Sequence, residues 1–309
     1  MIAPSPVVGR AAALAALALV FNALVWGTSW WPFRWLQAAG LHPLWATTLI
    51  YTLASLAIVA VRPRALGQVL RTPALWLLVA AAGTTNASFN WGVVIGDVVR
   101  VVLLFYLMPL WTVLLARLLL GERFTAAAAL RTVLALVGAA IVLWPGPDAG
   151  PVDFALQLPV PRSLADWLGL VGGFSFALNN VMLRREAGRP EEGRALAMFL
   201  GGAIVAGALA SALAANGQVR WPAPADASAW LVPVALLTVL FLAGNLALQY
   251  GAARLAANRT AVVMLTEVGF ASASAIAFGG GTLTARIAVG GGLIVASALL
   301  AALAPAERH

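Results

Sequence analysis

Glu267 is the only acidic residue of a long apolar segment, residues 259–279. A carboxylate at the centre of a bilayer costs about 2.5–3.5 kcal/mol even on a lenient insertion scale, so Glu267 is expected to face a cavity or a partner. There it could take part in proton coupling or bind the ammonium group of a substrate. The structural alternative is a protonated Glu267 that hydrogen-bonds to a neighbouring helix.

Two pairs of amide side chains repeat one spacing in separate segments. Asn86 and Asn90 are four positions apart, as are Asn245 and Gln249, and residues four apart share a helix face. The second pair follows the first by 159 positions. This pattern predicts the opposite walls of one polar cavity. The alternative is that each amide only holds two helices together, which contributes about 0.6 kcal/mol.

An aromatic segment near the N-terminus contains three further candidates for substrate binding. Trp26 and Trp30 share one helix face, and Ser29 lies between them. Pro32 cannot donate to the carbonyl of Thr28, so a free backbone acceptor and a bend are expected there. Transporters bind polar ligand groups at such sites, and indole rings can stack on aromatic or cationic groups. The alternative for the tryptophans is an aromatic belt at the membrane surface.

Tyr106 and Asn179 complete the predicted substrate-binding set. Pro109 predicts a kink near Tyr106, whose hydroxyl could face the cavity. Asn179 lies in another apolar segment, residues 166–185. No catalytic residue is predicted.

Composition excludes several classes of site. The chain has no cysteine and two histidines, so thiol chemistry and a histidine-rich metal centre are not expected. The motifs HExxH and Gly-x-Ser-x-Gly are absent, which argues against an intramembrane enzyme. No metal or cofactor is therefore predicted. The net charge of +8 comes from arginines at the ends of apolar segments, which indicates membrane topology and not nucleic-acid binding.

The apolar content predicts an all-α polytopic membrane protein. The 309 residues are 62% hydrophobic and 10% charged, more apolar than a soluble domain can bury. Long apolar runs separated by short breaks are typical of membrane helices. Ten transmembrane helices are predicted at residues 11–35, 44–61, 74–95, 98–119, 126–144, 166–185, 195–214, 229–251, 259–279 and 285–304.

Arginine placement and a proline-rich stretch predict the topology. Fourteen arginines fall on the side of the N-terminus and five on the other, so both termini are expected in the cytoplasm. Residues 146–165 form a Pro-rich extracytoplasmic linker between two five-helix repeats, 1–145 and 166–309. Because five is odd, the second repeat enters the membrane from the opposite side. At one outer turn, Asp97 and Arg100 are expected to form a local ion pair.

The inverted repeat is also visible as an internal duplication. Arg100 to Thr125 returns 159 positions later as Arg259 to Thr284. Gly121 recurs in this register as Gly280. Inverted repeats are typical of secondary transporters, which bind substrate near the bilayer midplane.

The sequence resembles the drug/metabolite transporter superfamily, in particular its EamA-type members. The resemblance covers essentially the whole chain and rests on Trp26-Gly27, on Tyr106-x-x-Pro109 and on the stretch Leu120-Gly-Glu-Arg-Phe-Thr125. The chain departs from the pattern at Gly280-Gly281, where the second repeat lacks the Gly-Glu signature. The resemblance implies a ten-helix inverted repeat and a relative of bacterial exporters of amino acids and other small metabolites.

Together these patterns predict a multi-pass transporter of the bacterial inner membrane, exporting amino acids by alternating access around a midplane cavity. The alternatives are a multidrug or other metabolite permease, a channel or an intramembrane enzyme. The expected partners are a small-molecule substrate and the lipid bilayer. The Gly290–Gly292 run could pack within the bundle or between the protomers of a homodimer.

Overall fold

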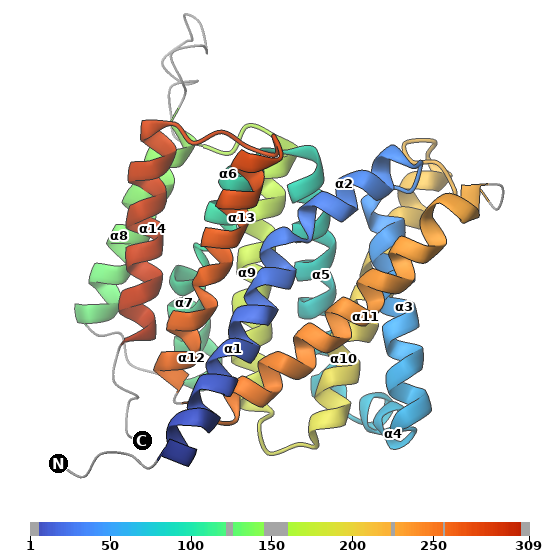
Figure 1. Ribbon diagram of the computed structural model, residues 1–309, viewed down its shortest axis with the longest axis horizontal. Coiled ribbons are helices and arrows are strands. Elements are labelled where there is room, and N and C mark those ends of the chain that lie inside the picture. Colours follow the sequence, from blue (N-terminus) through green and yellow to red (C-terminus); the bar gives the residue numbers. More distant parts are fainter. Residues whose placement is uncertain (1–5, 122–125, 145–159, 224–225, 256, 304–309) are drawn as a thin grey trace, which may run out of the picture.

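A computed structural model describes residues 6–121, 126–144, 160–223, 226–255 and 257–303. These residues form helices joined by short connections and contain no strand (Figure 1). The helices of the first half are α1 (Pro6–Thr28), α2 (Trp30–Ala38), α3 (Pro43–Val61), α4 (Arg64–Arg71), α5 (Pro73–Ile95), α6 (Val98–Phe105), α7 (Met108–Leu120) and α8 (Ala126–Leu143). Those of the second half are α9 (Leu164–Arg185), α10 (Glu191–Ala215), α11 (Ala227–Ala252), α12 (Ala257–Met264), α13 (Thr266–Ala277) and α14 (Ala285–Ala302).

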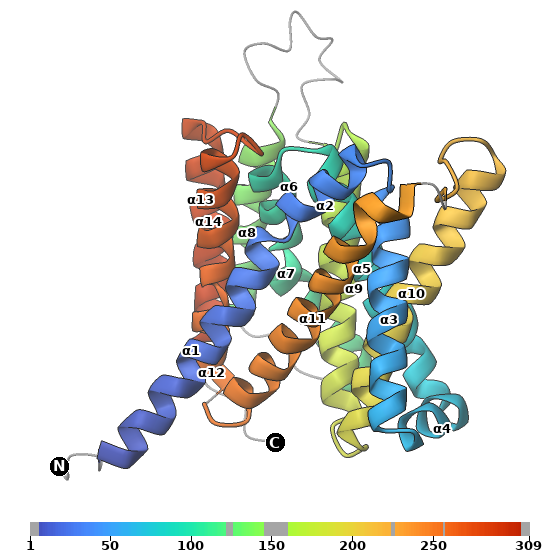
Figure 2. The ribbon, with the colours of Figure 1, turned by 45° about the vertical axis from the view of Figure 1, so that its right-hand side comes forward.

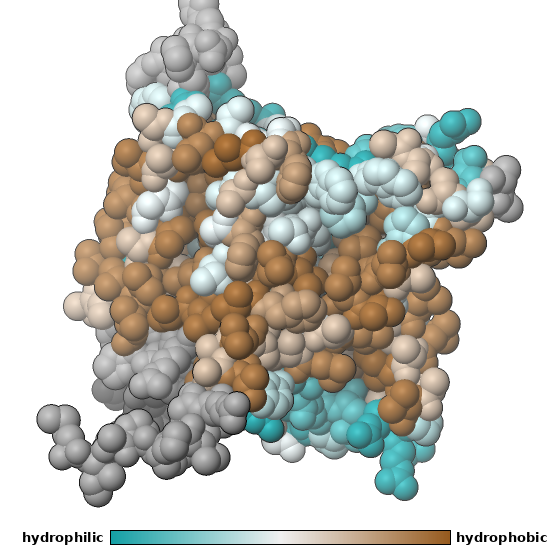
Figure 3. All heavy atoms as spheres, in the orientation of Figure 1, coloured by the Kyte–Doolittle hydropathy of each residue, from teal (hydrophilic) through white to brown (hydrophobic). Residues whose placement is uncertain are grey.

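The face of the bundle seen in Figure 3 is largely apolar, with polar surface toward its two ends. Within the described residues, five helical stretches are long and apolar enough to cross a membrane, or six if the bent pair α4–α5 is one span. The other predicted spans correspond to helices that are too short or too polar to be counted as membrane-crossing by length and composition alone. The all-helical membrane architecture is thus confirmed.

Two helix breaks lie where the prolines predict them. α1 ends at Thr28, four residues before Pro32, and α6 ends at Phe105, four residues before Pro109. Proline has no N–H to donate to the carbonyl four residues back, so the helical ladder is interrupted at these positions.

A third break occurs without proline. α12 ends at Met264 and α13 begins at Thr266. The hydroxyl of Thr266 donates to the carbonyl of Val263 at 2.7 Å, and backbone bonds to the third residue back surround Leu265. Competition of this kind between a side chain and the helical ladder weakens a helix locally. The sequence analysis did not predict this break.

Helices from the two halves of the chain are interleaved. α5 packs against α9 and α10, α1 packs against α11 and α13, and α8 pairs with α14. In Figure 2, α1 and α11 slant in the same direction and lie close together near their lower ends. The start of α1 and the end of α14 lie at the same end of the bundle (Figure 1).

A buried ion pair joins the halves, and it corrects the local pairing predicted for Asp97 and Arg100. The guanidinium of Arg100 binds Asp166, with Nε 2.6 Å from Oδ1 and Nη2 3.0 Å from Oδ2. Asp166 also forms a capping box with Ser163 at the start of α9. Asp97 instead accepts from the backbone N–H groups of Arg100 and Thr282. Asp166 is farther from Arg100 in sequence than Asp97 is, but in the fold Asp166 is the acid that its guanidinium binds.

We expect Asp166→Ala to lower the free energy of unfolding by about 1.5–3 kcal/mol, because it removes charge-assisted hydrogen bonds and a helix cap. Thermal unfolding of the purified protein in detergent measures the change. Asp226→Ala is the matched control, since Asp226 precedes α11 but makes no capping bond with its side chain. Equal melting temperatures for the two variants would contradict the structural role of Asp166.

Candidate functional site

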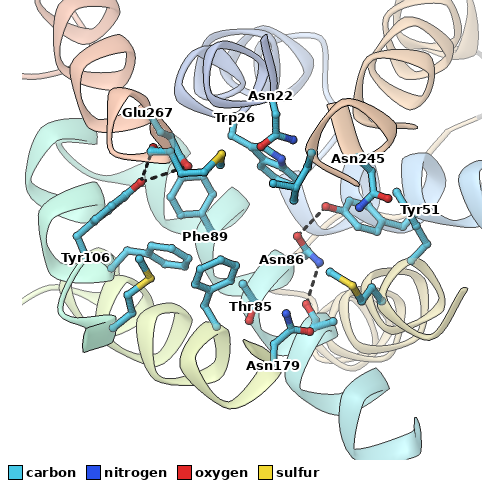
Figure 4. Close-up of a pocket in the computed structure, with 18 residues that line it drawn as sticks. Asn22, Trp26, Tyr51, Thr85, Asn86, Phe89, Tyr106, Asn179, Asn245 and Glu267 are labelled. Atoms are coloured by element: carbon cyan, nitrogen blue, oxygen red, sulfur yellow. Dashed lines mark hydrogen bonds between the residues drawn. The ribbon is translucent and has the colours of Figure 1, made fainter. Parts of the chain in front are cut away.

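A cavity lies inside the bundle, between helices of both halves (Figure 4). Its volume is about 130 Å³, counted as the space open to the centre of a water molecule. One water needs about 10–15 Å³ on this measure, so the space suits a ligand of about ten non-hydrogen atoms. The lining residues are Asn22, Trp26, Tyr51, Ala82, Thr85, Asn86, Phe89, Phe105, Tyr106, Met108, Phe176, Asn179, Met198, Phe199, Asn245, Leu248, Met264 and Glu267.

Glu267 lines the cavity from the first turn of α13, next to the break at Leu265. The hydroxyl of Tyr106 is 3.3 Å from Oε2 of Glu267 and 3.5 Å from the carbonyl oxygen of Met264. The N-terminus of a helix favours a negative charge. The break therefore places the carboxyl at a helix start that can stabilise it.

Gly27 allows α1 to approach α13 closely beside Glu267. A Cβ atom at Gly27 would lie 2.8 Å from the carbonyl oxygen of Glu267 and from Cβ of Phe270. Neither atom can move without shifting α13. The Trp26-Gly27 motif thus combines a cavity residue with a close helix contact.

The amides of α5 differ in what they face. Asn86 lines the cavity, accepts from the hydroxyl of Tyr51 at 2.6 Å and donates to the carbonyl of Ala82 at 2.8 Å. Asn90 is fully buried beside the cavity and donates to Oγ1 of Thr47 at 3.1 Å. One member of the predicted pair therefore lines the cavity and the other joins α5 to α3.

The amides of α11 behave in the same way. Asn245 lines the cavity, and its Oδ1 accepts from Nε2 of Gln249 at 2.7 Å. Gln249 lies outside the lining, so it orients Asn245 from behind.

The predicted aromatic segment is also divided. Trp26 lines the cavity and stacks on Phe241, with ring centroids 4.6 Å apart. Trp30 is buried outside it, where Nε1 donates to Oγ of Ser274 at 2.9 Å. Ser29 is also buried and donates to the carbonyl of Trp26. Trp30 and Ser29 thus hold the wall behind Trp26.

Two of the amides that line the cavity have a buried oxygen without a hydrogen-bond partner among the described residues. Asn179 lines the cavity as predicted, and Asn22 lines it from α1, one helical turn before Trp26. Asn22 donates to the carbonyl of Gly244 at 2.8 Å. Oδ1 of both residues has no hydrogen-bond partner.

Sequence reasoning did not include the apolar wall or Tyr51 in the site. Phe105 packs against Phe89 and Phe176, with centroids 5.0 and 5.2 Å away. Apolar residues on a membrane helix carry no signal that separates a cavity wall from a helix contact. Asn22 was also missing from the predicted site, although the sequence does carry a signal for it: a polar residue in an apolar span is a functional candidate by default.

In the described part of the chain, no group of three or more His, Cys, Asp or Glu residues could hold a metal.

Glu267 and Tyr106 lie on one side of the cavity in Figure 4, and Tyr51, Asn86 and Asn245 lie on the other. Rings of Trp26 and Phe89 stand between them. These residues form a candidate ligand-binding site.

Comparisons with known proteins agree with this geometry. The sequence matches the EamA-like transporter family over residues 13–144. Residues 13–144 are an EamA-like transporter domain. The resemblance found in the sequence is therefore confirmed. A domain of this family implies a membrane transporter of the drug/metabolite transporter superfamily, and not an enzyme.

A solved structure described as "Crystal structure of protein" has a similar fold, with a TM-score of 0.53 at 21% sequence identity. The likeness covers 93% of this chain and 96% of that chain. No curated protein matches the sequence. The EamA-like domain supplies the cavity residues of α1, α3, α5, α6 and α7, and the remaining lining residues follow it in the chain.

In the EamA-like domain, we expect Gly27→Ala to destabilise the protein by about 1–3 kcal/mol through overpacking against α13. Thermal unfolding in detergent measures the effect. Gly269→Ala is the control, since no atom lies within 4 Å of a Cβ at Gly269. If both variants melt together, the close contact of α1 with α13 is not as described.

Proposed function

We propose that this protein is a secondary transporter that exports small amine-bearing metabolites, amino acids among them, by alternating access around the central cavity. One observation carries the proposal: the cavity wall is built from equivalent positions of the two halves. Asn86 and Asn245 both line it and lie 159 positions apart. Three further lining pairs have the same spacing: Phe89 with Leu248, Phe105 with Met264, and Met108 with Glu267.

The helix contacts support an inverted repeat of five plus five helices. In such a repeat each helix of the first half has an equivalent in the second. The equivalent pairs are α1 and α9, α3 and α10, α5 and α11, α6–α7 and α12–α13, and α8 and α14. The contact of α5 with α9 then becomes that of α11 with α1, and the contact of α7 with α9 becomes that of α13 with α1. The pairs α3–α10 and α8–α14 map onto themselves. Ten passes result when α1–α2, α4–α5, α6–α7 and α12–α13 each count as one broken or bent pass.

The positions of the helix breaks support the same duplication. The interruption between α6 and α7 falls at Tyr106 and Leu107, and 159 positions later that between α12 and α13 falls at Leu265. Broken helices at a midplane site are a feature of secondary transporters, because half-helix ends can meet polar groups there.

Topology follows from the charge distribution. With the arginine-rich side in the cytoplasm, both termini are inside and the end of the bundle that carries α2 is outside. In a bacterium the protein would span the inner membrane. Proton coupling through Glu267 and assembly as a homodimer remain predictions.

Hydrogen bonds between the halves close the proposed outer end, which supports alternating access. Oδ2 of Asp97 accepts from the N–H of Thr282 at 2.8 Å. The N–H of Val98 donates to the carbonyl of Gly280 at 3.0 Å, and Nη2 of Arg34 reaches the same oxygen at 3.2 Å. Such contacts must break for the cavity to open outward.

Counterflow into proteoliposomes tests the transporter proposal. We expect saturable uptake of a labelled amine-bearing metabolite that unlabelled metabolite inside the vesicles accelerates. Glu267→Gln and Asn245→Ala should each reduce the rate at least about tenfold if they contact substrate, whereas Glu191→Gln, an exposed acid at the start of α10, should not. Flux that rises linearly with concentration would indicate a channel.

We expect Asp97→Ala to favour opening of the proposed outer end, because the halves lose their bond at Thr282. The chain has no cysteine, so Thr85→Cys in the cavity wall gives a single labelling site. A membrane-impermeant maleimide added outside should label it faster in the Asp97→Ala background than in the Asp226→Ala background. Unchanged rates would show that Asp97 does not hold the outer end closed.

A further inference from the structure

The cavity wall contains one ionisable acid and no basic side chain. Among its 18 lining residues, all within the described part of the chain, Glu267 is the only acid, and none is Arg, Lys or His. An ionised group that leaves water for a cavity of low polarity needs a partner of opposite charge or several hydrogen bonds. The wall can offer such a partner to a cation but not to an anion.

Two amide oxygens of the cavity wall have no hydrogen-bond partner among the described residues. Asn22 and Asn179 have relative exposures of 1% and 2%, and Oδ1 of each lacks a partner. The orientation of the Asn22 amide follows from its donation to the carbonyl of Gly244, which leaves the oxygen available. Buried acceptors without donors are costly, so a ligand that brings N–H groups would be favoured here.

The donors of the cavity are largely occupied within the wall. The hydroxyl of Tyr51 donates to Asn86, the amide of Asn86 donates to Ala82, and the hydroxyl of Tyr106 points at Glu267. Asn245 uses its oxygen to accept from Gln249, which leaves its NH₂ group for a ligand. The neutral N–H donors of the wall, those of Asn179 and Trp26 included, have no cation beside them and share the cavity with the carboxylate of Glu267. Such a site is weak for a second carboxylate.

Aromatic rings form the rest of the surface between these polar groups. The ring of Phe105 contacts those of Phe89 and Phe176, and Trp26 also lines the cavity. Ring faces attract a cation and pack against an apolar body. The wall therefore favours a positively charged head on an apolar or aromatic group.

Building on the transporter function proposed above, we propose a narrower substrate class in which free amino acids are no longer included: a small organic cation, an amine on an apolar or aromatic body that carries no carboxylate. Its ammonium group binds the carboxylate of Glu267. Oδ1 of Asn22 and of Asn179 accept further hydrogen bonds from the substrate, and the rings enclose its body. A free amino acid has the ammonium group but adds a carboxylate that the wall does not match.

Binding of matched compounds to the full-length protein in detergent tests this assignment by titration calorimetry. One series is phenethylamine, phenylalanine and 3-phenylpropionate; the others are the indole series and a straight-chain aliphatic series of the same head groups. We expect the amine of at least one series to bind at least about tenfold more tightly than its amino acid, because a charge-assisted contact is not offset by an unpaired carboxylate. The carboxylic acid should not bind.

Two variants separate the contacts. Glu267→Gln keeps the shape of the side chain and should weaken amine binding at least about tenfold, while Glu191→Gln, which removes an exposed acid, should leave it unchanged. Asn179→Leu removes an oxygen that has no partner in the wall and should weaken amine binding by about threefold or more. This second variant keeps the test valid if Glu267→Gln does not fold.

The outcomes distinguish the two proposals. Tighter binding of the amino acid than of the amine, together with its saturable counterflow, would overturn the cation assignment and leave the transporter function in place. Equal binding to the parent protein and to both cavity variants would also overturn it. If no series binds and none shows saturable flux, both proposals fail.

Discussion

A polar group in the hydrocarbon of a membrane must find a partner inside the protein, and this constraint organises the structure. The helices α1 and α6 end at Thr28 and Phe105, each four residues before a proline that has no N–H to donate to the carbonyl there. Glu267 follows a third break and meets the hydroxyl of Tyr106. The amide of Asn86 is paired at both its oxygen and its nitrogen. The polar groups of the middle layer therefore gather around one cavity, with apolar side chains turned toward lipid.

Close helix contacts hold this polar layer in place. At Gly27 the backbones of α1 and α13 approach so closely that one methyl group would displace the helix that carries Glu267. Gly83 and Gly201 allow the same approach of α5 to α10. Contacts at this distance couple the position of the carboxyl to the packing of the bundle. A relative movement of the halves would therefore change the surroundings of Glu267 directly.

Much of the fold and part of the site could be predicted from the sequence. Apolar runs indicate membrane helices through their length, and Pro32 and Pro109 indicate breaks because a missing N–H acts locally. A repeated spacing singled out the polar residues Asn86 and Asn245, and both line the cavity. The partner of Arg100 could not be predicted, because Asp166 is 66 positions away and reaches it only when α6 packs against α9.

The sequence by itself determined the helical membrane class, the likeness of residues 13–144 to the EamA-like family and the residues that are expensive to leave in lipid. Only the tertiary structure decided which of them line the cavity: Trp26 does, whereas Trp30, Asn90 and Gln249 support the wall from behind. Helical spacing shows that two residues share a face but not how the helix is rotated against its neighbours. That rotation is set by contacts between segments far apart in the chain. The same long-range packing leaves Glu267 as the only charged side chain among the lining residues.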